Sequence, residues 1–337
     1  MKNIVRSAIK QIVEYALKYS SFRNHLYHLV LRSMELDFAT KGEAWRIFDP
    51  IYTRIKRRLI KEPLWRYNPQ FVRVTAKSAY DALVQHVSIE NKTYCEIGCG
   101  EHHPYGTSTI IYINGASSAI ATDLKDTDKK RAAEALYDLL LECLAHPEDW
   151  HWSGLSRDDY LKRIYSFNLK VLREGDLDAG IAAVPIKHVI TNIYEPAIQP
   201  DSIDVMSSRA VLEHFLDFEL ACKKLYSLMS ADSVAYHKID LVDHRGYDES
   251  LNYHWWSFLA ENEQWSGDAG NRLRSSEIRE YFEKTGFEIL SYDDREKAEM
   301  PVGFRKKIKG RFAEMPDEEL SIIRIACVLR KPKIKRT

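Results

Sequence analysis

The chain has 337 residues, which is enough for one large α/β domain with additions. Its 49 Lys and Arg residues balance its 49 Asp and Glu residues, so the zero net charge gives no electrostatic reason to expect a nucleic-acid partner. Hydrophobic residues make up 45% and charged residues 29% of the chain, the ordinary balance of a globular protein, and neither a signal peptide nor a membrane-spanning apolar run is expected.

Residues 1–88 are predicted to form a basic helical region. Helical periodicity covers residues 3–33, and further helical stretches are expected at 43–61 and 70–88. The first 75 residues contain 15 Lys and Arg residues against 6 Asp and Glu residues. A basic amphipathic helix either packs on the core or on a partner chain, or it makes peripheral contact with an anionic membrane surface. The sequence leaves both possibilities open, together with the oligomeric state.

The five cysteines contain no C-x-x-C pair, and most of them fall within predicted strands or helices. We therefore expect reduced core cysteines, no metal ion held by them and a reducing, cytoplasmic location, with membrane-peripheral attachment as the variant that the basic N-terminal helix would allow.

Strand and helix patterns alternate from residue 89 to residue 331, before a basic tail at 332–337. This alternation predicts an α/β fold with a largely parallel sheet and helices on both faces. The strands are expected near 93–97, 119–122, 188–193, 203–207, 233–239, 287–292 and 321–330, and the helices near 107–114, 128–145, 209–229 and 275–285.

Two connections, near 146–185 and 240–275, are longer than the alternating pattern requires. Both are rich in aromatic residues, which argues against disorder. The second connection follows the fifth strand, and ligands of open α/β sheets bind beyond the carboxyl ends of the strands. It is therefore the leading candidate for substrate binding, and the alternative is a small satellite core beneath the loop.

A glycine-rich turn follows the first strand. Glu96, Gly98 and Gly100 form a Glu-x-Gly-x-Gly pattern, in which the glycines remove side chains where a backbone must approach a ligand. Asp123 closes the second strand and is well placed to bind a ribose diol. This combination predicts a nucleoside-binding unit, although a tight turn without a ligand would also use these glycines.

The same turn argues against a dinucleotide. The third glycine of the G-x-G-x-x-G fingerprint is replaced by His103, and the Glu96 carboxylate would repel a pyrophosphate. A carboxylate can attract an ammonium group, and S-adenosylmethionine carries an ammonium, a sulfonium and no phosphate. S-adenosylmethionine is therefore the predicted cofactor.

The ordered motifs resemble those of class I S-adenosylmethionine-dependent methyltransferases over roughly residues 93–331. The matching segments are Glu96–Gly100, Ala121–Leu124, Asp201–His214, Thr285–Ile289 and Ala326–Lys331. Asn192 and Ile193 stand where that family often has an acid near the adenine ring, and the Asn192 carbonyl oxygen can still accept a hydrogen bond from the adenine amino group. The resemblance implies a Rossmann-like, seven-stranded sheet whose last strand runs antiparallel, within a methyltransferase domain at 89–331.

Methyl transfer to a hydroxyl requires a base, because a hydroxyl is rarely ionised at neutral pH. His237, at the end of the fifth strand, is the first candidate, and Asp240 and His214 are further catalytic candidates. Asp240, Asp243 and His244 offer an alternative divalent-metal site, but carboxylates that orient histidines and substrate hydroxyls are the preferred explanation, so no metal ion is predicted. Candidate substrate-binding residues are Asp243, His244, Trp255 and Arg272.

The loop pattern also resembles methyltransferases of bacterial polysaccharide gene clusters, which implies O-methylation of a small-molecule or glycan acceptor. The aromatic connections suit stacking on a sugar ring. Two alternatives remain at this point, a cofactor-binding scaffold without turnover and a nicotinamide-dependent oxidoreductase. The presence of Glu96, Gly98, Gly100 and Asp123 together argues against the first, and His103 argues against the second.

Overall fold

The computed structural model describes residues 69–100, 103–247, 253–261 and 270–333. The predicted helices at 3–33 and 43–61 and the end of the basic tail lie outside the described residues, so the role of the basic N-terminal region stays a prediction. No helix of the described ranges is both long enough and apolar enough to cross a membrane.

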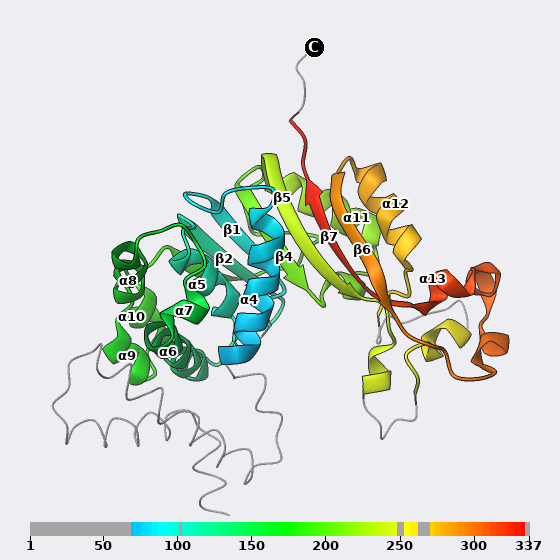
Figure 1. Cartoon of the computed structure of the whole chain (residues 1–337), viewed down its shortest axis with the longest axis horizontal. Coiled ribbons are helices and arrows are strands. Elements are labelled where there is room, and N and C mark those ends of the chain that lie inside the picture. The colour runs from blue at the N-terminus through cyan, green and yellow to red at the C-terminus, as the bar shows by residue number, and fades with distance from the viewer. Residues whose placement is uncertain (1–68, 101–102, 248–252, 262–269, 334–337) are drawn as a thin grey trace, which may run out of the picture. The chain divides into compact units, whose positions relative to one another are not determined.

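Seven strands form one sheet in the order β3-β2-β1-β4-β5-β7-β6 (Figure 1). β7 runs antiparallel to both β5 and β6, whereas β4 pairs in parallel with β1 and with β5. This confirms the predicted seven-stranded, mostly parallel sheet. The strands are β1 Thr93–Ile97, β2 Ser118–Asp123, β3 Ile186–Ile190, β4 Ile203–Arg209, β5 Met229–Asp240, β6 Glu288–Lys297 and β7 Ile322–Arg330.

The described residues divide into two compact units. One contains residues 69–78, 89–91 and 99–190, and the other contains residues 79–88, 92–98 and those from 191 onward. Helix α4, Pro69–Val84, contributes residues to both. The predicted domain boundaries, at residue 88 and at the two insertions, stay a prediction.

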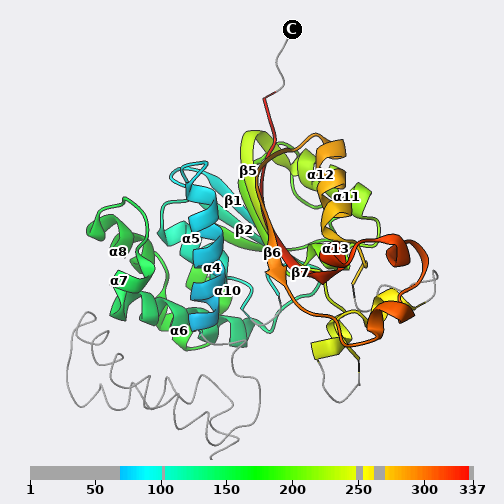
Figure 2. The same ribbon diagram turned by 45° about the vertical axis from the view of Figure 1, so that its right-hand side comes forward.

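The first unit contains β2, β3 and six helices. α5, Gly106–Ile113, is buried along its length and packs on β2, while α6, Lys129–Ala145, packs against the short helices that follow it (Figure 2). These are α7 Pro147–Trp150, α8 Arg157–Tyr165, α9 Leu169–Arg173 and α10 Leu177–Ile181. The predicted insertion near 146–185 is therefore helical, and its Trp150 and Tyr160 are completely buried.

In the second unit, α11 Phe218–Leu228 and α12 Ser275–Thr285 pack against each other and against the sheet (Figure 1). The Asp217 side chain caps α11 by accepting a hydrogen bond from the Leu220 amide. Gly286, in the left-handed region at a φ of 102°, ends α12. β4 is buried from Val205 to Ser208 and β5 from Ser233 to His237, as expected for central strands of such a sheet.

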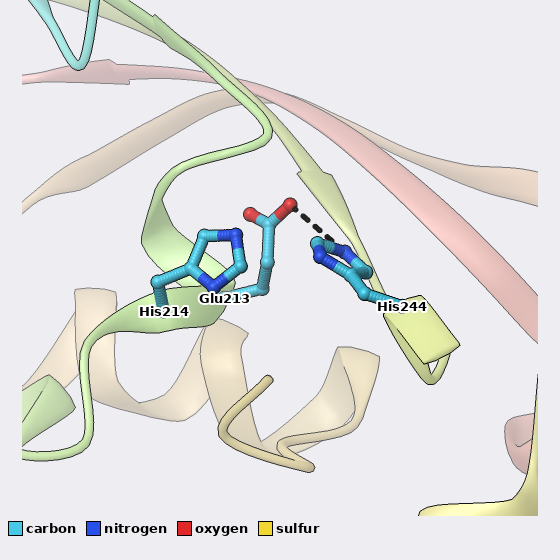
Figure 3. A group of neighbouring side chains, drawn as sticks. All are labelled: Glu213, His214 and His244. Atoms are coloured by element: carbon cyan, nitrogen blue, oxygen red, sulfur yellow. Dashed lines mark ion pairs between the residues drawn. The ribbon is translucent and has the colours of Figure 1, made fainter. Parts of the chain in front are cut away.

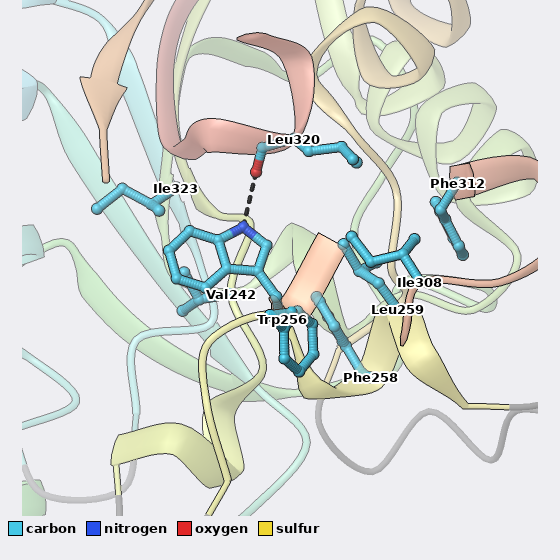
Figure 4. Close-up of a cluster of buried hydrophobic side chains, with 9 residues drawn as sticks. Val242, Trp256, Phe258, Leu259, Ile308, Phe312, Leu320 and Ile323 are labelled. Carbon is cyan, nitrogen blue, oxygen red and sulfur yellow. Dashed lines mark hydrogen bonds between the residues drawn. The ribbon is translucent and has the colours of Figure 1, made fainter. Parts of the chain in front are cut away.

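A satellite core lies beneath the connection after β5 (Figure 4). Trp256 is buried at its centre and donates a hydrogen bond from Nε1 to the Leu320 carbonyl oxygen at 2.7 Å. The other elements of this core are the 3-10 helices η5 Ser257–Ala260, η6 Phe304–Lys307 and η7 Gly310–Glu314 and the helix α13 Asp317–Ser321. The aromatic residues Trp256 and Phe258 therefore serve packing, which is the alternative that the sequence left open.

Candidate functional site

The glycine turn after β1 faces the residue that follows β4. Gly98 has a φ of +70°, and a Cβ placed there would lie 2.3 Å from Cγ2 of Val211. Only glycine therefore fits at this position. β1 and β4 are adjacent and parallel, and the chain leaves them toward opposite edges of the sheet. Such a switch point is where open α/β sheets bind their ligands.

Gly100 and Asp123 meet in the first unit. The Gly100 amide donates to Oδ2 of Asp123 at 2.8 Å, and the Lys125 amide donates to Oδ1 at 3.1 Å. The Cys99 amide also donates to the Thr122 carbonyl oxygen, at 2.9 Å, so the turn is tied to the end of β2. Gly100 has a φ of +78°, and a Cβ there would meet no atom of the described residues within 4 Å. An ordered carboxylate beside open space fits a ribose diol.

Asn192 and Ile193 lie between β3 and β4. The Asn192 Oδ1 accepts a hydrogen bond from the Tyr194 amide at 3.0 Å. Asn192 is exposed, whereas Ile193 is buried. The carbonyl oxygen has a second lone pair that an adenine amino group can use. Adenine contact by this pair stays a prediction.

His237 lies inside the protein rather than on its surface. Its Nδ1 is 2.8 Å from Oγ of Ser208, and its ring stacks on Phe282 with centroids 6.1 Å apart. The side chain has no exposed area, and burial lowers the pKa of His237 from 6.5 to about 3. These contacts are those of a neutral core histidine, and the predicted role of His237 as a base stays a prediction.

The buried state of His237 gives a testable pH dependence. Because the pKa is about 3 in the folded protein and 6.5 in the reference state, the unfolded chain binds the proton more readily between these values. The stabilisation from a neutral His237 is therefore complete above about pH 6.5 and declines as the pH falls. At about 1.4 kcal/mol per pH unit, the change from pH 7 to pH 5 removes about 2 kcal/mol.

The unfolding free energy of the unmodified protein should fall between pH 7 and pH 5. In His237→Gln this fall should be about 2 kcal/mol smaller, as measured by urea denaturation of both proteins at both pH values. His254→Gln, at an exposed position, is the matched control. If the loss is the same with and without His237, the histidine is not held neutral by burial.

The carboxylates after β5 are already engaged. Asp240 pairs with Arg324 of β7 and accepts a hydrogen bond from the Tyr247 hydroxyl at 3.2 Å. Asp243 is completely buried and accepts two hydrogen bonds from the Arg245 guanidinium, at 2.9 and 2.6 Å. Both acids therefore fix the shape of the loop. Their predicted catalytic and substrate-binding roles stay predictions.

The other two predicted substrate residues lie near the satellite core. Arg272 is buried, donates from Nη1 to the Phe258 carbonyl oxygen at 3.1 Å and lies over the Phe312 ring. Trp255 is partly buried and packs against the same core. Contact of either residue with a substrate stays a prediction.

A cluster of Glu213, His214 and His244 brings together the ends of β4 and β5 (Figure 3). Oε1 of Glu213 is 3.6 Å from Nε2 of His244, and the two imidazole centroids are 4.8 Å apart. Glu213 is buried, His244 is half-buried and His214 is exposed. The figure shows the carboxylate between the two rings, so the cluster has a buried acidic centre and one exposed side.

The predicted helix over 209–229 is present only in its second part, so its predicted start was wrong. The 3-10 helix η2, Leu212–His214, ends before an extended residue, and α11 begins only at Phe218. Asn271 holds this arrangement. Its side-chain nitrogen donates to the carbonyl oxygens of Leu212 and Phe215, each at 3.1 Å, and its amide donates to the Glu213 carbonyl oxygen at 2.6 Å.

His244 is held by a second turn, the 3-10 helix η3, His244–Tyr247. The Asp243 amide donates to the Trp255 carbonyl oxygen at 2.8 Å, and the Arg245 amide donates to Oδ1 of Asp243 at 3.0 Å. The ion pair of Arg245 with Asp243 closes the turn. The loop therefore presents the His244 ring to Glu213 with little freedom.

Burial dominates the electrostatics of the cluster. Desolvation raises the pKa of Glu213 to about 8 and lowers the pKa of both His214 and His244 below the ordinary value of 6.5. The proximity of His244 lowers the pKa of His214 further. Neither carboxylate oxygen of Glu213 makes a hydrogen bond within the part of the chain that the structure describes. Two neutral imidazoles beside such a carboxyl group can take up a proton or a cation.

Among the sequence-predicted residues, the structure brings His214 and His244 together and engages Asp240 and Asp243 elsewhere. Glu213 and Asn271 were not among the predicted site residues. The sequence signal that points to Glu213 is its position beside His214 directly after the fourth strand. The signal for Asn271 is weaker, because its partners lie 56 to 59 residues away in the chain.

A family model described as a methyltransferase domain matches residues 70–292. No curated protein matches the chain. Solved structures with a similar fold include an S-adenosylmethionine-dependent methyltransferase from Mesorhizobium loti, at 13% identity and a TM-score of 0.40, covering 75% of this chain and 97% of that one. Another is phosphoethanolamine N-methyltransferase 2 from Haemonchus contortus in complex with S-adenosyl-L-methionine, at 13% identity and a TM-score of 0.43, covering 77% and 52%.

Proposed function

Because this chain belongs to the methyltransferase domain family and is an S-adenosylmethionine-dependent methyltransferase, we propose that it methylates a hydroxyl oxygen of a small-molecule or glycan acceptor. We further propose that the acceptor hydroxyl loses its proton at the cluster of Glu213, His214 and His244. The single observation that supports this is a buried carboxyl group, located between two imidazoles beyond the carboxyl ends of β4 and β5, whose oxygens make no close hydrogen bond to the described residues.

The residues around the glycine turn suit the cofactor. When bound, S-adenosylmethionine supplies an activated methyl group on a sulfonium. Asp123 would bind the ribose diol, Gly98 and Gly100 would let the backbone approach the nucleoside, and the Glu96 carboxylate would attract the ammonium group. Asn192 and Ile193 would contact the adenine.

The position of Val211 indicates that the glycine turn and the cluster lie close together. Its side chain fills the space that a Cβ on Gly98 would need, and it precedes Glu213 by two residues. An acceptor that contacts the exposed His214 would therefore have its hydroxyl near the turn that receives the cofactor. Positioning the nucleophile in this way contributes on the order of 7–11 kcal/mol in favourable cases.

The cluster suits an oxygen nucleophile better than a nitrogen nucleophile. A hydroxyl must lose its proton before or during methyl transfer, whereas a neutral amine already has a free lone pair. Imidazoles whose pKa lies below 6.5 are neutral at pH 7 and able to accept a proton. His237 has no exposed surface to meet an acceptor, which is why we assign the step to the cluster.

The acceptor is identified by incubating the protein with 13C-methyl S-adenosylmethionine and panels of sugars, glycans and small hydroxyl or amino compounds. We expect the label in a methoxy group, which carbon chemical shift distinguishes from an N-methyl group. Label on nitrogen would refute the O-methylation proposal, and the acceptor that carries the label defines the substrate class.

Asp123→Ala should weaken S-adenosylmethionine binding about 10- to 100-fold, measured by calorimetry. Hydrogen bonds to a charged group contribute about 1.5–3 kcal/mol, and 1.4 kcal/mol corresponds to a factor of ten in affinity. Asp126→Ala is the control, because Asp126 is exposed and its side chain accepts a local hydrogen bond from the Thr127 amide at 2.8 Å. Equal affinity of both variants would contradict the ribose role of Asp123.

A further inference from the structure

We infer that Glu213, His214 and His244 form a binding site for one divalent first-row transition-metal ion of the Zn²⁺ type, and that the ion's open position takes the acceptor hydroxyl. The part of this inference that concerns methyl transfer rests on the proposed function. Metal binding itself does not depend on it.

The first argument is the set of donor atoms. A carboxylate and two imidazoles are ligands that divalent zinc, iron, cobalt and manganese use, and three protein ligands with an open position are typical of catalytic metal sites. Mg²⁺ and Ca²⁺ prefer sites built from oxygen alone. The two nitrogen donors therefore favour a transition-metal ion.

The second argument is the lack of other partners. Both carboxylate oxygens of Glu213 and Nε2 of His244 are buried and make no hydrogen bond to any residue of the described ranges. Glu213 has only 2% of its surface exposed. A buried polar atom without a partner costs on the order of 1–3 kcal/mol, and a bound cation would offset that cost at three atoms together.

The third argument is distance. The candidate ligand atoms of the three residues all lie within 4.8 Å of one another, and the Glu213 to His244 pair is already at 3.6 Å. Metal bonds of about 2.0–2.2 Å place tetrahedral ligand atoms roughly 3.4 Å apart. Only His214 has to move closer, and its exposed side chain is the one with room to rotate.

The neighbouring charges leave the three ligands available. Asp240 is the other carboxylate whose charge acts on both histidines, and it is paired with Arg324 and hydrogen bonded to Tyr247. Asp243 is paired with Arg245. Asp240 and Asp243 are therefore paired with arginines, whereas within the described ranges Glu213 has only the imidazole of His244 as an ion-pair partner.

A bound ion would explain how the cluster activates a hydroxyl. Zn²⁺ lowers the pKa of a bound water to about 7, and it acts on a coordinated hydroxyl in the same way. With the ion bound, the two imidazoles would act as its ligands instead of accepting the proton, and the acceptor oxygen would release its proton to water. Its lone pair then forms the bond to the methyl carbon, while the electron pair of the broken carbon–sulfur bond stays on sulfur.

Titration of the full chain with Co²⁺, in the absence of cofactor and acceptor, tests the site directly. We expect visible d–d absorption bands that saturate at one equivalent, and displacement by Zn²⁺ but not by Mg²⁺. His244→Ala and Glu213→Gln should weaken Co²⁺ binding by at least about 10- to 100-fold, since even outer-shell partners of a metal have effects of that size.

Glu148→Gln is the matched control, because Glu148 lies 3.7 Å from Nδ1 of His146 but is exposed. It should bind Co²⁺ as the unmodified protein does. Circular dichroism checks the fold of each variant, and His214→Ala, at an exposed position, replaces any variant that does not fold. Absence of the bands, or bands unchanged in the His244 and His214 variants, would overturn the inference.

The two proposals fail in different ways. If the protein transfers methyl groups to oxygen equally well with and without a chelator, and binds no Co²⁺, the metal site is refuted and the function stands. If Co²⁺ binds at the cluster but the label of the methyl donor appears on nitrogen, the metal site stands and the oxygen acceptor is refuted.

Discussion

Replacing Glu213 with glutamine or His244 with alanine is expected to lower kcat by about 10²–10⁴-fold, while the affinity for S-adenosylmethionine changes less than twofold. Proton removal by a positioned group contributes a factor of that size. The cofactor affinity is preserved because the residues assigned to the nucleoside and the ammonium group are unchanged. Methyl transfer at saturating cofactor and acceptor gives kcat, and calorimetry gives the cofactor affinity.

Two further variants serve as the control and as the test between the two candidate bases. Glu148→Gln, which changes an exposed carboxylate beside a histidine, should leave kcat unchanged. His237→Gln separates the two candidate bases. If the cluster is the base, this variant should change the stability of the protein and keep the kcat of the unmodified protein. A loss of 10²-fold or more in His237→Gln, with normal kcat in His244→Ala, would return the role of base to His237.

Arg274→Met is expected to lower the unfolding free energy by about 3–5 kcal/mol. The guanidinium is completely buried and donates to the carbonyl oxygens of Leu241, at 2.6 Å, Leu320, at 3.2 Å, and Ile322. Burial lowers the pKa of Arg274 to about 10, so the group is still charged at neutral pH. Without it several buried carbonyl groups lose a donor, and loss of one partner of a buried charged network typically has a cost of this size.

The matched control is Arg279→Met on the same helix. Arg279 is exposed and pairs with Glu283 four residues later, so its loss should change the unfolding free energy by less than about 1 kcal/mol. Urea denaturation of both variants measures the difference. Similar midpoints would show that the Arg274 carbonyl contacts contribute little. Because Leu241 begins the loop that carries His244, Arg274→Met should also raise the mobility of that loop.

The central strands of the sheet were predictable from sequence because most of their residues are buried. Short segments rich in apolar residues, such as Tyr94–Ile97 and Ala119–Ala121, can be recognised without knowing their partners, and all seven predicted strands are present. The glycine turn was predictable for a different reason. Positive φ at Gly98 and Gly100 restricts those positions to glycine, so the requirement is visible in the residue type itself.

The side-chain roles were harder to predict, because they depend on partners far away in the chain. Asp240 pairs with Arg324, 84 residues later, and Arg274 bonds to carbonyl groups up to 48 residues away. A charged side chain in a loop is interpreted as solvent-exposed or functional as long as such a distant partner is unknown. The burial of His237 was hard to predict for the same reason, since the sequence near a strand end does not show that Phe282 will stack on the histidine.

Glu213 shows what the sequence lacked. The expected helix over 209–229 would have placed Glu213 near a helix N-terminus, where an acidic residue needs no other explanation. The structure replaces that turn with η2, held by Asn271, and turns the carboxylate toward His244. Predicting this would have required the pairing of β4 with β5 and the bonds of Asn271 together.

The central claim is that the Glu213–His214–His244 cluster activates the acceptor for methylation, and one comparison tests it most directly. Transfer of a 13C-labelled methyl group to the identified acceptor is measured with the unmodified protein and with His244→Ala, at equal cofactor occupancy. The account predicts a methoxy product and a rate at least 10²-fold lower in the variant. An N-methyl product, or equal rates, would contradict it.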